Sequence, residues 1–140
     1  MIQRLSHVSV FVLDQERALA FYRDRLGFDV RRDETFGPGM RWVTVGPKSQ
    51  PDLELVLLPT SPNPMMTPER SAALRALIED GAFGIGVFET ADVQATYREL
   101  LAKGVKTRGE PQERPYGTEV VVQDDSGNWF SLVQRPAKAR

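Results

Sequence analysis

The chain has 140 residues, the length of one ordinary domain, and 41% of them are hydrophobic and 26% charged, as in a globular protein. Its 18 basic and 19 acidic residues nearly cancel, which argues against a nucleic-acid partner held by bulk positive charge. The absence of cysteine excludes disulfides, thiolate metal sites and a cysteine nucleophile. The single histidine, His7, excludes a metal site that takes two imidazoles from one chain. With no signal-like leader and no apolar run of about 20 residues, we expect a cytoplasmic protein without a membrane partner.

The first half of the sequence predicts a strand, a helix and three more strands. Residues 8–13 are rich in Val, Phe and Leu, as a buried strand is. Asp14 then caps a predicted helix whose apolar face recurs every four residues, and Gly27 supplies the left-handed residue that ends it. Three strand-like segments follow at residues 28–32, 40–45 and 53–58.

The second half repeats this order. A strand is predicted at residues 85–88, and a helix begins at Asp92 and ends at Gly104. The distance from the capping aspartate to the glycine differs by one residue between the halves. The last three strands are expected at residues 105–108, 118–123 and 129–134, with a tight turn at residues 125–128 before the final one.

The repeat predicts one α+β domain over residues 1–140. Its parts are a first βαβββ module at residues 1–60, a linker with a helix at residues 61–81, and a second βαβββ module at residues 82–136. Alternation along the first strand places Val8, Val10 and Val12 under the helix and His7, Ser9 and Phe11 on the opposite face. Two such modules pair into an open, eight-stranded, barrel-like sheet around a concave pocket.

Three motifs make the resemblance to a known family specific. They are LSHVSV at residues 5–10, the capping aspartate followed by AFY and LGF within residues 14–28, and DSGNWFSL at residues 125–132, and RPYG at residues 114–117 adds to them. On these motifs the chain resembles the vicinal oxygen chelate superfamily of glyoxalases, bleomycin-resistance proteins and extradiol dioxygenases. The resemblance covers about residues 1–135. It implies the paired-module fold and a homodimer.

The resemblance also implies four metal-ligand positions, one on the first and one on the last strand of each module. In this sequence they are His7, Glu54, Ile85 and Ser131. Ile85 has no donor atom and a serine hydroxyl is a weak ligand, whereas catalytic zinc takes three protein ligands. We therefore expect no cofactor. The alternative is a divalent metal on His7 and Glu54 with Glu119, from the adjacent strand, as a third ligand.

Alternation within the predicted strands gives an apolar, aromatic pocket with few polar groups. Its candidate ligand-binding residues are Ser9, Phe11, Trp42, Ile85, Val87, Tyr116, Glu119, Trp129 and Ser131. Plain core packing of Trp42 and Trp129, and a solvent-facing Glu54, are the alternatives for these positions. The loops at residues 33–40, 46–52 and 109–117 are expected to set the shape of the pocket.

Three functions fit this pattern. The first is metal-free binding of an aromatic or hydrophobic small molecule, as in bleomycin-resistance-like members of the family. The second is an enzyme, a lyase, isomerase or dioxygenase, that uses a metal or uses His7 and Glu54 as a catalytic acid–base pair. The third is a structural or regulatory homodimer without a substrate.

Overall fold

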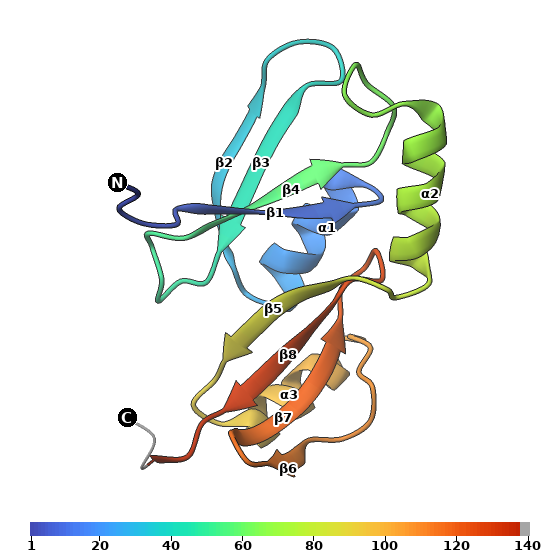
Figure 1. Cartoon of the computed structure of the whole chain (residues 1–140). Helices are drawn as coiled ribbons and strands as arrows, with labels where there is room; N and C mark the ends of the chain where they lie inside the picture. The colour runs from blue at the N-terminus through green and yellow to red at the C-terminus, as the bar shows by residue number, and fades with distance from the viewer. Residues whose placement is uncertain (138–140) are drawn as a thin grey trace. The chain divides into compact units, whose positions relative to one another are not determined.

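A four-stranded sheet covered by one helix occurs twice in the computed structural model, which describes residues 1–137. The last three residues of the predicted domain, 138–140, lie outside the described part. The chain divides into two compact units, Met1–Ile78 and Glu79–Arg140, called unit 1 and unit 2 below (Figure 1). Each unit has the predicted order of strand, helix and three strands.

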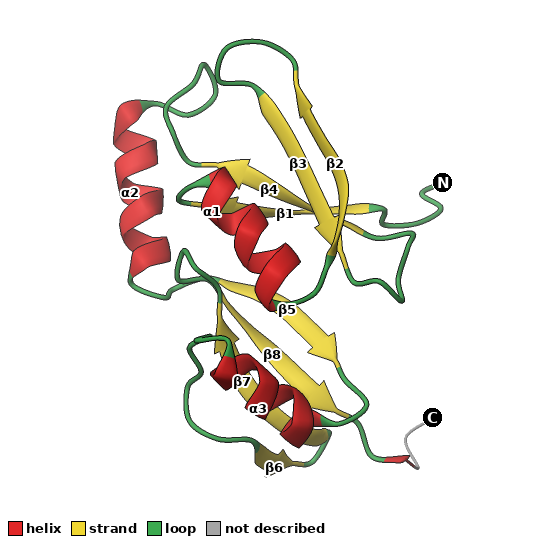
Figure 2. Cartoon of the chain, turned by 180° about the vertical axis from the view of Figure 1, so that it is seen from behind, coloured by secondary structure: helices red, strands yellow, loops and turns green. Residues whose placement is uncertain are grey.

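The sheet of unit 1 has the strand order β1-β4-β3-β2. Strand β1 runs parallel to β4, and the other neighbours are antiparallel. Helix α1 packs against β3 and β4 and covers one face of the sheet (Figure 2). The elements of unit 1 are β1 (His7–Val12), α1 (Gln15–Ala20), the π-helical turn η1 (Phe21–Arg25), β2 (Asp29–Thr35), β3 (Arg41–Gly46), β4 (Glu54–Pro59) and α2 (Pro68–Glu79).

Local signals in the sequence set the ends of helix α1. The side chain of Asp14 accepts a hydrogen bond from the Arg17 backbone N–H at 2.9 Å, which caps one of the unpaired donors of the first turn. The helix continues into η1, and Gly27 then adopts a left-handed φ of 72°, a conformation that glycine reaches without steric cost. Both end signals predicted from the sequence are confirmed.

The buried face of this helical segment builds the core of unit 1. Tyr22 is fully buried, and its ring centroid lies 5.3 Å from that of Phe21 and 5.7 Å from that of Phe28. Helix α2 is tied to the same unit by Arg75, whose Nη1 donates to the Leu13 carbonyl at 3.0 Å and to the Thr60 hydroxyl at 2.8 Å.

Unit 2 repeats the arrangement with the strand order β5-β8-β7-β6. Helix α3 packs against β7 and β8, and its N-terminus is capped by Asp92, which accepts from the Ala95 N–H at 3.0 Å. The edge-to-face ring pair of Phe88 and Phe130, with centroids 4.8 Å apart, lies in its core. The elements are β5 (Gly84–Glu89), α3 (Val93–Ala102), β6 (Gln112–Arg114), β7 (Gly117–Gln123) and β8 (Trp129–Gln134).

One expectation needs correction. Residues 105–108 are not a strand: only Thr107 forms an isolated bridge, with Val122, and the strand that pairs with the start of β7 is β6. The left-handed Gly109, with φ 84°, and Pro111 turn the chain between these two segments. The eight strands form two hydrogen-bonded sheets of four within the described residues, one in each unit, as the predicted βαβββ modules require.

The described part of the chain contains no helix that is both long enough and apolar enough to cross a bilayer.

Candidate functional site

One face of the sheet in unit 1 carries no helix. Along β1, Val10 and Val12 are buried, while His7, Ser9 and Phe11 are exposed, as alternation predicts. Successive pairs across β1 and β4 on this face are His7 with Glu54, Ser9 with Val56, and Phe11 with Leu58. The face therefore changes from polar to apolar along the strands, over about 13 Å between His7 and Phe11.

The polar end of this face is a hydrogen-bonded group of four side chains. His7 Nε2 lies 3.1 Å from Glu54 Oε2, and the other carboxylate oxygen accepts from the Thr44 hydroxyl at 2.6 Å. On the far side of the imidazole, Ser6 Oγ lies 2.8 Å from Nδ1. A serine that donates to Nδ1 leaves the proton on Nε2, where it faces Glu54. The His7 side chain is 43% exposed and that of Glu54 21%, so the pair remains accessible.

The apolar end of the unit carries a groove of about 470 Å³ between the tip of the β2–β3 hairpin and the loop that follows β4. Three of its side chains are unusually exposed for their type: Phe36 at 65%, Met40 at 63% and Met65 at 85%. The residues that line it are Phe36, Gly39, Met40, Arg41, Trp42, Pro59, Asn63, Pro64 and Met65. Trp42 is the one lining residue predicted from the sequence.

Apart from Arg41 on β3 and Pro59 on β4, the structure places the other groove residues in turns rather than on strand faces. Phe36 and Met40 flank the Gly37-Pro38-Gly39 turn, whose ends are closed by the hydrogen bond from Phe36 N to the Met40 carbonyl. Met65 N donates to Asn63 Oδ1 in a second turn. Strand alternation does not reach turn residues, but exposed Phe and Met beside a Gly-Pro-Gly turn are a sequence signal for such a surface.

Unit 2 contains a second cluster of hydrogen-bonded side chains, with the carboxylate of Glu119 on β7 at its centre. Its Oε2 accepts from the Ser131 hydroxyl at 2.6 Å and its Oε1 from the Tyr116 hydroxyl at 2.8 Å, and Arg114 Nε lies 3.6 Å from Oε1. These partners, with the Ser131 hydrogen bond as the largest cause, hold the pKa of Glu119 below its usual value. Both oxygens of the Glu119 carboxylate therefore bind side chains of unit 2.

The internal repeat relates the Glu54 cluster of unit 1 to the Glu119 cluster of unit 2. The carboxylate and the hydroxyl, however, stand on opposite strands of the pair in the two units. Thr44 pairs with the residue two positions after Glu54, and Glu119 pairs with the residue two positions after Ser131. Thr44 thus corresponds to Glu119, and Glu54 to Ser131. In unit 1 the hydroxyl is on β3 and the carboxylate on β4, whereas in unit 2 the carboxylate is on the earlier strand, β7.

Strand β5 departs from β1 at the position that corresponds to His7. A bulge separates the pair of Gly84 with Trp129 from the pair of Val87 with Ser131, so Ile85 lies within the irregular segment. Gly84 is required at its position, since a Cβ there would lie 2.6 Å from the Trp129 ring. Val87, which has no metal-binding atom, therefore occupies the register position opposite Ser131.

These donors do not match the divalent-metal site that the family resemblance implies. Among residues 1–137 no three His, Cys, Asp or Glu side chains are grouped so that they could hold a metal ion. His7 and Glu54 supply one imidazole and one carboxylate, and Glu119 has both oxygens hydrogen-bonded to Ser131 and Tyr116. A catalytic zinc needs a third protein ligand.

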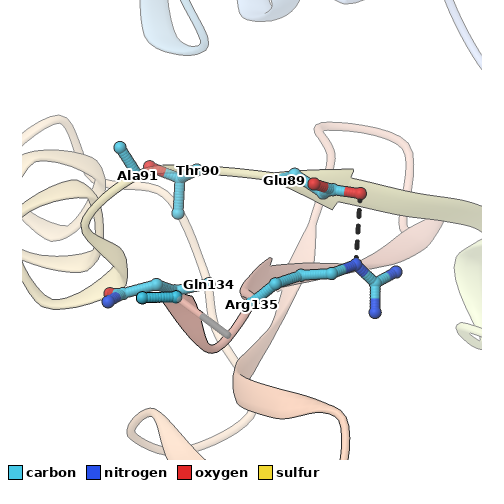
Figure 3. A pocket seen from close by; sticks show the side chains of 6 residues that line it. Glu89, Thr90, Ala91, Gln134 and Arg135 are labelled. Atoms are coloured by element: carbon cyan, nitrogen blue, oxygen red, sulfur yellow. Dashed lines mark hydrogen bonds and ion pairs between the residues drawn. The ribbon is translucent and has the colours of Figure 1, made fainter. Parts of the chain in front are cut away.

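A further pocket in unit 2, of about 440 Å³, has a mixed polar and apolar lining, and its charged side chains are paired (Figure 3). Arg135 Nε contacts Glu89 Oε2 at 3.2 Å, and Gln134 Oε1 accepts from the Val93 N–H at 2.9 Å. The pocket thus offers a ligand less apolar surface than the groove of unit 1.

Replacing Ser131 by alanine is expected to raise the pKa of Glu119 toward its usual value, because the alanine removes the hydrogen bond that contributes most to the lowering. A lowered pKa stabilises the fold above the ordinary glutamate pKa, and this stabilisation is lost as the pH falls through the folded value. In Ser131→Ala the stabilisation that Glu119 contributes is therefore smaller, and its loss is complete at a higher pH. NMR titration of the Glu119 carboxyl carbon tests this, and an unchanged pKa would contradict the assignment.

Comparison with known proteins agrees with this architecture. The model of the Glyoxalase/Bleomycin resistance protein/Dioxygenase superfamily matches residues 4–132. The chain is 35% identical over 132 residues to the uncharacterized protein YetH of Bacillus subtilis (strain 168), a match that covers 94% of this chain and 98% of YetH.

Two crystal structures share both the fold and much of the sequence. UcmS2 superposes with a TM-score of 0.91 at 50% identity, over 96% of this chain and 99% of that one. TnmS3, an antibiotic binding protein from Streptomyces sp. CB03234, superposes with a TM-score of 0.74 at 32% identity, over 96% and 98% of the two chains. The chain belongs to the Glyoxalase/Bleomycin resistance protein/Dioxygenase superfamily.

Proposed function

We propose that this protein binds an aromatic small molecule non-covalently in the groove of unit 1 and does so without a metal. The observation that carries the proposal is the groove itself, whose walls are formed by Phe36, Met40, Trp42, Pro59 and Met65. Small-molecule sites are typically concave and mostly apolar, with volumes of roughly 300–1,000 Å³, and this groove lies in that range.

The lining residues favour a flat, polarisable ligand. Aromatic rings such as those of Phe36 and Trp42 stack on or edge against other rings with a gain of about 0.5–1.5 kcal/mol per pair beyond area burial. The thioethers of Met40 and Met65 adapt to irregular shapes and also contact aromatic rings favourably. Because all three of Phe36, Met40 and Met65 are more than half exposed, a ligand would bury apolar surface that now faces water.

The relationship to TnmS3 supports the same class of function. TnmS3 is an antibiotic binding protein, and the present chain aligns with nearly all of it at 32% identity. We therefore propose that the ligand is an antibiotic, or another natural product of a size that fits the groove. The donor set of His7 and Glu54, which falls short of a catalytic metal site, supports binding without a metal.

The proposal is tested by titrating the purified protein with flat polycyclic aromatic antibiotics while recording tryptophan emission. Trp42 lines the groove and Trp129 belongs to unit 2, so Trp129→Phe leaves Trp42 as the only tryptophan. We expect saturable quenching in Trp129→Phe with one ligand per chain. Emission that none of the compounds alters in either protein would contradict binding at the groove.

The 3.1 Å contact between His7 Nε2 and Glu54 Oε2 favours a second candidate function, acid–base catalysis on a bound molecule that reaches the polar end of the helix-free face of unit 1. In this arrangement Glu54 orients the imidazole, and Ser6 sets which nitrogen carries the proton. His7 Nε2 and Glu54 would then hold one proton between them and pass it to, or take it from, a molecule bound at the polar end of this face.

Mass spectrometry separates catalysis from binding. Catalysis predicts a chemically altered ligand after incubation with the wild-type protein, and recovery of intact ligand after incubation with His7→Ala. Binding is measured on the same two proteins, so that loss of conversion is not confused with loss of affinity. A ligand that the wild-type protein binds and returns unchanged would contradict the catalytic candidate.

We also propose that the chain forms a homodimer. Strand β1 is at the edge of its sheet, and an uncovered edge presents unpaired backbone groups to another chain. Light scattering at micromolar concentration should report twice the mass of the chain, and a monomer would contradict this expectation.

A further inference from the structure

We propose that the groove of unit 1 selects uncharged aromatic ligands over anionic ones, because Arg41, the one charged side chain among the described residues that line it, is already neutralised by Asp33 and Glu16. This inference rests on the proposed function and names the ligand class of the same site. It assigns the selection to two carboxylates that do not themselves line the groove.

All three nitrogens of the Arg41 guanidinium have carboxylate partners. Nε and Nη2 donate to the two oxygens of Asp33, each at 2.8 Å, in a bidentate pair that joins β3 to β2. Nη1 donates to Glu16 Oε2 at 2.6 Å and so joins β3 to α1. Arginine normally recognises an anion through this same planar fork. Three of its five N–H groups are thus engaged by carboxylates, so a ligand carboxylate, sulfonate or phosphate would have to share Arg41 with Asp33 and Glu16.

The local charge also disfavours an anion. One guanidinium and two carboxylates sum to a single negative charge beside the groove wall. The Arg41 and Asp33 side chains are 27% and 39% exposed, so water screens their charges less than at an open surface, whereas Glu16 is 72% exposed and its charge is screened more. The two carboxylates hold the pKa of Arg41 above its usual value, and Arg41 holds the pKa of Asp33 below its own, so Arg41 and Asp33 both stay ionised near neutral pH.

The other lining residues do not offset this charge. They are apolar side chains, glycine and proline, apart from Asn63, whose Oδ1 already accepts from the Met65 N–H at 2.8 Å. An anionic ligand would lose hydration on entering the groove and would gain no cation in return. An uncharged ring system of the same shape does not incur that penalty.

A matched pair of fluorescent probes tests the inference: neutral N-phenylnaphthylamine and its sulfonated analogue anilinonaphthalenesulfonate. Both become bright in an apolar site, and they differ by one negative charge. We expect the wild-type protein to bind the neutral dye at least tenfold more tightly in low-salt buffer. In Glu16→Gln/Asp33→Asn, which frees Arg41, the affinity for the sulfonated dye relative to the neutral dye should rise roughly fivefold.

A charge-matched control is available in unit 2. Glu89→Gln/Glu99→Gln removes two exposed carboxylates that pair with Arg135 and Lys103, and it should leave the ratio of the two affinities within twofold of wild type. Circular dichroism checks that each variant is folded, and Arg41→Met is a second test that should lower the relative affinity for the sulfonated dye. Equal wild-type affinities for the two dyes, or a ratio that Glu16→Gln/Asp33→Asn does not change, would overturn the inference. Failure of the wild-type protein to bind either dye would instead count against the groove as a binding site.

Discussion

Replacement of Trp42 by alanine is expected to weaken the binding of N-phenylnaphthylamine at least tenfold. Trp42 lines the groove, and removing its ring takes away a face on which an aromatic ligand can stack. A loss of about 60 Å² of apolar contact at roughly 25 cal/mol per Å² is worth about 1.5 kcal/mol, which corresponds to a tenfold change in affinity. The measurement is a titration followed by emission of the dye, so the removed tryptophan does not affect the signal.

Leu77→Ala is the control for this prediction. Leu77 is an exposed apolar residue of unit 1, but it lies on α2 and is not among the residues that line the groove. Its replacement should change the dye affinity less than twofold. If Leu77→Ala and Trp42→Ala weakened the dye equally, the dye would be binding to general apolar surface and the assignment of the groove would be wrong.

Replacement of Tyr22 by alanine is expected to lower the free energy of unfolding by about 3–5 kcal/mol, the usual loss for a large buried aromatic residue. Tyr22 is fully buried at the junction of α1 and β2 and contacts the rings of Phe21 and Phe28. Alanine would leave a cavity where these rings meet. Unfolding by urea, followed by circular dichroism, measures the loss.

Leu101→Ala is the comparison for stability. Leu101 is an apolar residue of α3 that is 45% exposed, so its truncation removes little buried surface and should lower the free energy of unfolding by about 1 kcal/mol or less. A loss for Tyr22→Ala that is no larger than the loss for Leu101→Ala would contradict the packing described for unit 1.

The internal repeat could be predicted from the sequence because each signal that marks it acts over a few residues. Asp14 and Asp92 cap helices through N–H groups three positions along the chain, and Gly27 adopts its left-handed conformation regardless of distant contacts. The two-residue period of β1 likewise predicted which of its residues are buried. The prediction of a strand at residues 105–108 was wrong because only Thr107 forms a bridge with β7, at Val122, before the chain turns at Gly109. Strand β6 then pairs with the other end of β7, and the path of this turn is not set by local propensity.

The candidate site was predictable only where it lies on strands. The contact of His7 with Glu54 followed from the family resemblance and agrees with the register of β1 and β4. The groove was found only in part, through Trp42, because Phe36 and Met65 are placed by turns whose geometry has no simple period. The exchanged positions of the hydroxyl and the carboxylate in the two units could not be predicted from the sequence. They follow from the register in which β3 pairs with β4 and β7 pairs with β8.

Chemical-shift mapping of the backbone amides by NMR, during titration with N-phenylnaphthylamine, tests the central claim most directly. If the protein binds an aromatic molecule in the groove of unit 1, the amides that shift in a saturable way will cluster in residues 36–42 and 59–65. Shifts confined to unit 2, or the absence of saturable shifts at any amide, would contradict the account.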